Sequence, residues 1–105
     1  MPNSHLDAHR ITLQMAMAMT KRYRGKAGHG AVRSFWFPRE VFEALLAQPG
    51  CEGIRLYCAQ TTIGNADLVL VGTDERGDDF TSGEVMDMSL PCPPFCPAAP
   101  SALDG

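Results

Sequence analysis

The segment at residues 53–72, GIRLYCAQTTIGNADLVLVG, limits the possible folds more than any other part of this chain. Ile54, Leu56 and Cys58 alternate with less apolar residues, which is the period-2 pattern of a half-buried strand. A Gly-Asn dipeptide within residues 61–66 supplies a turn signal. The segment therefore predicts a β-hairpin, and we expect the other elements to pack around it.

The second strand of this hairpin is apolar on both sides. Its core, LVLV at residues 68–71, has no polar face, which is typical of a strand in the middle of a sheet or covered on both faces. On the first strand, Cys58 should point into the core with Ile54 and Leu56, where a free thiol packs as a small hydrophobe.

The rest of the chain predicts two helices and two short strands. Thr12 is a suitable N-cap for the first helix, and Pro38 suits the first turn of the second. Trp36 lies between a strand pattern and an amphipathic helix pattern, so we expect it in the core. These elements are a helix at residues 13–24, a strand at 34–37, a helix at 38–48 and a strand at 84–90.

The order α-β-α-β-β-β predicts an α+β fold. We expect two helices packed on one face of a small, mostly antiparallel sheet of three to four strands. The domain organisation should be a flexible N-terminal tail at residues 1–11, a single α+β domain at 12–90 and a Pro/Cys-rich tail at 91–105. Two helices leave the second face of the apolar strand uncovered, which predicts a homo-oligomer.

Charge is divided along the chain of 105 residues. Residues 1–50 hold seven Lys/Arg against three Asp/Glu, and residues 51–105 hold two against nine. The simplest interpretation is that the two halves complement each other. Few aromatic residues lie among the basic ones, so a nucleic-acid partner is not expected. The basic loop at residues 24–33, RGKAGHGAVR, lacks the phosphate-loop motif and is interpreted as a mobile linker.

Targeting signals are also absent from the sequence. No apolar run approaches the ~20 residues that a membrane-spanning helix needs. The first residues, MPNSHLDAHR, lack the basic and apolar regions of a signal peptide. The expected location is therefore the cytoplasm, with no membrane partner.

The last residues, LPCPPFCPAAPSALDG, change in composition. Four of the five prolines between positions 91 and 100 recur every third residue, as in a polyproline II helix that docks in an aromatic groove. That conformation places the Cα atoms of Cys92 and Cys96 ~12 Å apart, whereas a disulfide needs ~7 Å or less. The two cysteines can act together only if the residues between them turn, for which a cis peptide bond is one route.

The cysteines are the candidate ligands or redox groups that the spacing favours most. Cys92 and Cys96 form a C-x3-C motif within the range of zinc ligands, and Cys51 is a candidate third ligand for zinc or another thiophilic metal. Cytosolic cysteines are more often metal-binding or redox-active than structural. No catalytic signature is present, so the sequence favours a non-enzymatic protein without a cofactor.

The chain resembles a group of short bacterial proteins for which no activity is established. The resemblance rests on the Tyr23-Arg24 pair, on QPGCEGIRLY, on VLVGTDERGDD and on the tail motif P-C-P-P-aromatic-C. It covers residues 12–96 and implies a shared fold without implying a reaction.

Two functional hypotheses follow. The first is a non-enzymatic α+β interaction module, homo-oligomeric, whose Pro/Cys tail docks a protein partner. In that case removal of residues 91–105 should leave the fold intact. The second is a metal-binding or thiol-redox protein that uses Cys92 and Cys96.

Overall fold

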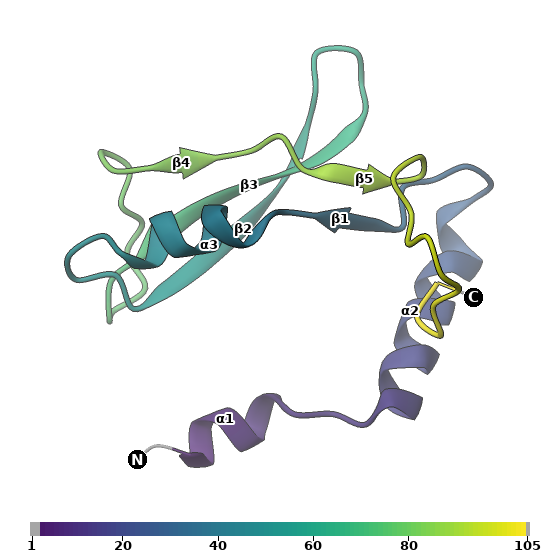
Figure 1. Ribbon diagram of the computed structural model, residues 1–105, viewed down its shortest axis with the longest axis horizontal. Coiled ribbons are helices and arrows are strands. Elements are labelled where there is room, and N and C mark those ends of the chain that lie inside the picture. Colours follow the sequence, from purple (N-terminus) through teal and green to yellow (C-terminus); the bar gives the residue numbers. More distant parts are fainter. Residues whose placement is uncertain (1–2, 105) are drawn as a thin grey trace. The chain divides into compact units, whose positions relative to one another are not determined.

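The computed structural model describes residues 3–104, and the side chains of residues 6–104 (Figure 1). Within this range it contains three helices and two small antiparallel sheets, which confirms the α+β class. The helices are α1 (Asn3–His9), α2 (Leu13–Ala27) and α3 (Arg39–Leu46). The strands are β1 (Ser34–Trp36), β2 (Gly53–Gln60), β3 (Ala66–Thr73), β4 (Val85–Met86) and β5 (Leu90–Cys92).

The chain divides into two compact units. Unit 1 comprises residues 1–33 and 97–105, and unit 2 comprises residues 34–96. Unit 1 contains six Lys/Arg and two Asp/Glu, for a formal charge of +4, and unit 2 contains three and ten, for −7. The charge division expected along the chain therefore follows the division into units.

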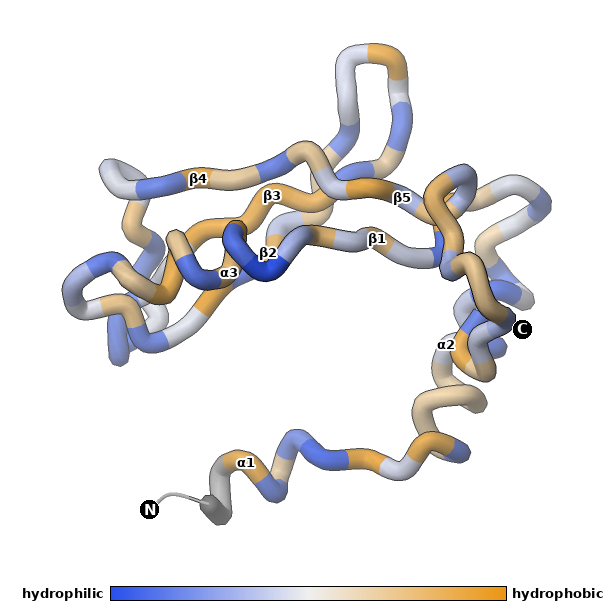
Figure 2. The backbone as a smooth tube through the Cα atoms, in the orientation of Figure 1, coloured by the Kyte–Doolittle hydropathy of each residue, from blue (hydrophilic) through white to orange (hydrophobic). Residues whose placement is uncertain are grey.

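The predicted hairpin is confirmed as β2 and β3. These two eight-residue strands pair antiparallel from Gly53↔Thr73 to Gln60↔Ala66. The short strand β4 pairs with the other side of β3, so the strand order is β2-β3-β4. The apolar β3 is the central strand, as its sequence predicts, and Figure 2 shows an apolar stretch at its label.

Helix α3 covers one end of this sheet. The four buried hydrophobic residues of the described chain are Leu45, Leu70, Val71 and Cys92, so the core is small. Leu45 lies on α3, which contacts β2 and β3, and it is fully buried. At Gly72 a Cβ atom would lie 2.8 Å from Gln48 Nε2, so the residues after α3 rest directly on the backbone of β3.

The prediction that Cys58 and Leu56 point into the core is wrong. Both are exposed, and Leu56 retains 51% of its accessible surface. Cross-strand partners share a face, so Leu56 and Cys58 lie on the same face as Gly72. Leu70, the cross-strand partner of Leu56 on the same face, is fully buried, so Leu56 is exposed because β2 is the edge strand and β3 the central one.

The second sheet consists of β1 and β5, which pair antiparallel from Ser34↔Cys92 to Trp36↔Leu90. The single strand expected at residues 84–90 is wrong: the chain forms β4, leaves the sheet near Met88 at a φ of 65°, and then forms β5. Trp36 is 57% exposed rather than part of the core, because a three-residue strand with one partner buries little of a large ring.

Unit 1 contains α1, α2 and the last residues of the chain. Thr12 caps α2 as predicted, and its hydroxyl accepts a hydrogen bond from the Met15 N–H at 3.1 Å. The helix extends three residues beyond its expected end, to Ala27, and Gly28 follows with a φ of 87°. It has no buried residue. Helix α1 forms within the segment for which the sequence predicts a flexible tail, and residues 1 and 2 of that segment lie outside the described part.

Candidate functional site

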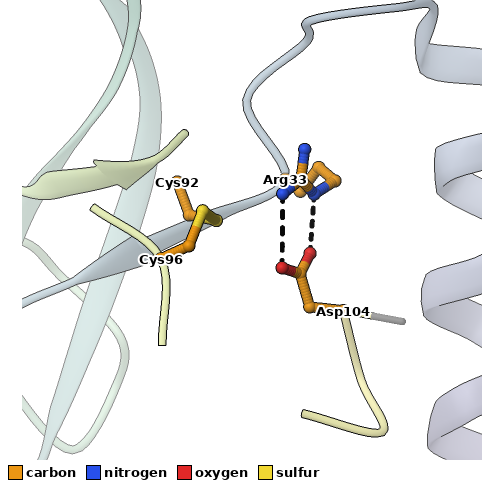
Figure 3. Close-up of a disulfide and its surroundings, with 4 residues drawn as sticks. All are labelled: Arg33, Cys92, Cys96 and Asp104. Carbon is orange, nitrogen blue, oxygen red and sulfur yellow. Dashed lines mark hydrogen bonds and ion pairs between the residues drawn. A yellow bond between two sulfur atoms is a disulfide. The ribbon is translucent and has the colours of Figure 1, made fainter. Parts of the chain in front are cut away.

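Cys92 and Cys96 form a disulfide within unit 2 (Figure 3). Their Cα atoms lie 4.7 Å apart, so this part of the tail turns and is not an extended polyproline helix. The Phe95 N–H closes the turn by donating to the Pro91 carbonyl oxygen at 2.9 Å. The Cys92–Pro93 and Pro93–Pro94 peptide bonds are both cis.

The two sulfur-bearing residues differ sharply in accessibility. Cys92 ends strand β5, pairs with Ser34 of β1 and is 1% exposed. Cys96 lies beyond the turn and is exposed. Its neighbour Phe95 is 56% exposed, which gives the accessible side of the disulfide an apolar surface.

The candidate third ligand, Cys51, lies at the other sheet of unit 2. Its thiol donates to the Gly53 carbonyl oxygen at 3.3 Å and lies over Gly72 of β3. Across residues 6–104, no three-ligand group combines Cys51 with Cys92 and Cys96. Thiolates bind metals, so a metal site at Cys92 and Cys96 would require the reduced chain.

Strand β2 is an edge strand, which makes it a second candidate site. The Thr61 N–H donates to the Asn65 carbonyl oxygen at 2.8 Å, so odd-numbered residues of β2 direct their backbone groups toward β3. The even-numbered residues direct theirs outward: Ile54, Leu56, Cys58 and Gln60. Within the described chain no strand pairs with this edge. Unpaired edges of this length are templates for pairing with another strand.

The segment after β3 folds back over the opposite face of β2. Asp79 accepts hydrogen bonds from the Tyr57 hydroxyl and from Arg55 Nη1, the latter at 2.5 Å. The same Arg55 nitrogen donates to the Gly77 carbonyl oxygen at 2.7 Å. The Tyr57 hydrogen bond, followed by Arg55, lowers the pKa of Asp79, and the Asp79 carboxylate raises the pKa of Tyr57. This network stabilises the strand from which Leu56 and Cys58 are presented.

In unit 1 the last residues bind two arginines of the basic loop region. Arg33 forms a bidentate ion pair with Asp104, with N–O distances of 2.6 and 3.2 Å (Figure 3). Arg24 Nη1 donates to the Leu103 carbonyl oxygen at 2.8 Å. A cavity of about 200 Å³ lies beside them, lined by Met19, Thr20, Tyr23, Arg24, Arg33 and Leu103. The two arginines thus bind residues 103 and 104, and the hydrogen bond from Arg33 lowers the pKa of Asp104.

No protein family, curated protein or solved structure matches this chain. The resemblance to short bacterial proteins therefore stays an expectation from the sequence. No described helix has the length and apolar character that crossing a membrane requires. The disulfide and the edge of β2 are therefore the two features of the described chain that indicate a function.

The sequence indicated Cys92 and Cys96 but did not indicate the edge or its supporting network. Arg55, Tyr57 and Asp79 come together across more than twenty residues, and no local spacing relates them. Only the alternation of β2 could have suggested that Arg55 and Tyr57 share a face.

Proposed function

We propose that this protein is a non-enzymatic interaction module that self-associates through the free edge of β2. The observation that carries the proposal is the unpaired eight-residue strand with exposed Leu56, Tyr57 and Cys58. In the proposed dimer, β2 pairs antiparallel with β2 of a second copy and joins two three-stranded sheets. The proposal keeps the cytoplasmic location that the sequence predicts.

The hydrogen-bonding pattern of the edge suits a second copy of the same chain. In an antiparallel pair with two-fold symmetry, residues whose backbone groups point outward must lie opposite each other. Every second residue of β2 points its backbone groups outward, so two copies of β2 can meet this requirement. A two-fold axis at Tyr57 places Leu56 opposite Cys58 of the second copy. The exposed apolar surface of Leu56 and Tyr57 is then covered by the second copy, which adds a hydrophobic contribution to the backbone hydrogen bonds.

The turn between Cys92 and Cys96 supplies a second contact surface in this proposal. Phe95 at the tip of the disulfide turn is 56% exposed, so an aromatic side chain is presented to a protein partner. An exposed aromatic residue on a closed turn loses little conformational freedom on binding.

A pair of lysine substitutions tests the proposed dimer. Leu56→Lys replaces an apolar contact at the edge by a charge that lies opposite Cys58 of the second copy and diagonal to the same charge there, so it should convert a dimer into a monomer. Ile63→Lys is the matched control, because Ile63 is 83% exposed in the hairpin connection and carries the same change in chemistry away from the edge. Size-exclusion chromatography with light scattering should give a monomer for the first variant and a dimer for the second. A monomeric wild-type chain at every concentration would contradict the proposal.

Cross-linking tests the register. In the Tyr57-centred pair, residues 56 and 58 of the two copies form a hydrogen-bonded position with Cα atoms ~5.5 Å apart, which suits a disulfide. Leu56→Cys should therefore give a covalent dimer on mild oxidation, in which the thiol introduced at position 56 is linked to Cys58 of the second copy. If the covalent dimer is instead linked only between the Cys58 residues of the two copies, the same edge pairs in a different register.

A further inference from the structure

The difference in exposure between the two sulfur-bearing residues determines which end of the disulfide can react. Thiol–disulfide exchange begins when a thiolate attacks one sulfur of the disulfide. Cys92 is 1% exposed on a paired strand, so an incoming thiolate is excluded from it. Cys96 is an exposed residue, so an incoming thiolate approaches the disulfide from this end.

We propose that the Cys92–Cys96 disulfide oxidises a dithiol, with Cys96 as the exchanging residue and Cys92 as the residue that leaves as a thiolate. This activity is independent of self-association through β2. A substrate thiolate attacks Cys96 Sγ, the Cys92–Cys96 bond breaks, and Cys92 leaves as a thiolate that takes up a proton. The second substrate thiolate then attacks the substrate sulfur of the mixed disulfide and releases Cys96. The dithiol loses two electrons and two protons, and the chain gains two thiols.

The surroundings of Cys96 favour a dithiol carried by a protein. Phe95 is 56% exposed beside the exchanging residue, and Pro94 is exposed as well. An apolar surface next to the reacting sulfur increases contact with a polypeptide more than with a small polar thiol. The chemical class of substrate is therefore a pair of cysteines in an accessible protein segment.

Trapping of the mixed disulfide tests the proposal on the full wild-type chain. The oxidised protein is mixed with a cysteine-containing peptide, quenched with acid and mapped by mass spectrometry. The adduct should lie on Cys96, with about tenfold less on Cys92, because access controls the site of attack. Equal adducts, or a preference for Cys92, would overturn the assignment.

Two serine variants give an independent measurement. In Cys92→Ser the exposed Cys96 remains, and in Cys96→Ser the buried Cys92 remains. With glutathione disulfide as the probe, Cys96 should react about tenfold faster than Cys92. Peptide mapping separates both from Cys51 and Cys58, and circular dichroism checks the fold of each variant. If Cys92→Ser does not fold, the wild-type trapping still decides the proposal.

The substrate class has its own test. Phe95→Ala should slow reduction of the disulfide by a dithiol peptide with aromatic flanking residues, by about threefold or more, and leave reduction by dithiothreitol unchanged. If the peptide reduces the disulfide of the wild-type chain and of Phe95→Ala at the same rate, recognition through Phe95 is excluded and the substrates are small dithiols.

Discussion

Arg55 Nη1 lies 2.5 Å from Asp79 Oδ1, and this ion pair joins β2 to the segment that follows β3. The Asp79 carboxylate also accepts from the Tyr57 hydroxyl, so one acidic residue stabilises two neighbouring residues of the edge strand. The side chain of Asp79 is 19% exposed, whereas that of Arg55 is 45% exposed. The network therefore stabilises β2 from the face opposite Leu56 and leaves its outer edge open.

This network predicts a dependence of stability on pH. The pKa of Asp79 is lower in the folded chain than its value of ~3.9 in an unfolded chain. The ionised carboxylate therefore stabilises the fold above about pH 4, and this contribution is lost as the pH falls through the folded-state pKa. Asp79→Asn should lower the thermal midpoint at pH 7. When the pH is then lowered, the midpoint of this variant should fall less than that of the wild-type chain. Asp78→Asn is the control, since the side chain of Asp78 is 72% exposed, and it should behave as wild type.

Adjacent leucines on α3 test the assignment of the core. Leu45 is fully buried and Leu46 is 52% exposed. Leu45→Ala should destabilise the chain by ~2–5 kcal/mol, because it removes buried methyl groups and leaves a cavity. Leu46→Ala should change the free energy of unfolding by no more than ~0.5 kcal/mol. Chemical denaturation measures both, and similar values for the two variants would show that α3 does not pack as described.

Two glycines give opposite predictions for the same substitution. A Cβ at Gly72 would lie 2.8 Å from Gln48 Nε2 and 2.9 Å from Cys51 Sγ. Gly72→Ala should therefore displace Gln48, which donates to the Leu45 carbonyl oxygen, and destabilise the chain by ~1–3 kcal/mol. Gly25 lies in α2 with nothing within 4 Å of its Cβ position, so Gly25→Ala should stabilise the helix by ~0.5–1 kcal/mol. A stabilising Gly72→Ala would contradict the contact.

Truncation tests where the last structural element ends. A chain ending at Cys96 retains β5 and the disulfide, whereas one ending at Leu90 loses most of the strand that pairs with β1. Hydrogen exchange should show protection of those β1 amides that face β5 in the longer chain, and no such protection in the shorter chain. Equal protection in both would instead support the tail boundary at residue 91 that the sequence predicts.

The sequence predicted features that depend on local patterns. The hairpin was predictable because alternation, a turn dipeptide and an apolar run lie within twenty residues, and the cap at Thr12 is a local interaction too. The exposure of Cys58 was not predictable, because it depends on the place of β2 at the edge of the sheet, which is set by strand pairing and not by local pattern. The spacing of Cys92 and Cys96 was compatible with an extended or a turned segment, and only the 4.7 Å separation of their Cα atoms decides between them.

The most direct test of self-association through β2 is the mass of two proline variants by sedimentation equilibrium. The wild-type chain should have about twice its monomer mass of 11.4 kDa. The Cys58 N–H points outward, so Cys58→Pro should give a folded monomer of 11.4 kDa. The Tyr57 N–H points toward β3, so Tyr57→Pro should instead disrupt the hairpin itself. A Cys58→Pro chain that remains dimeric would contradict association through this edge.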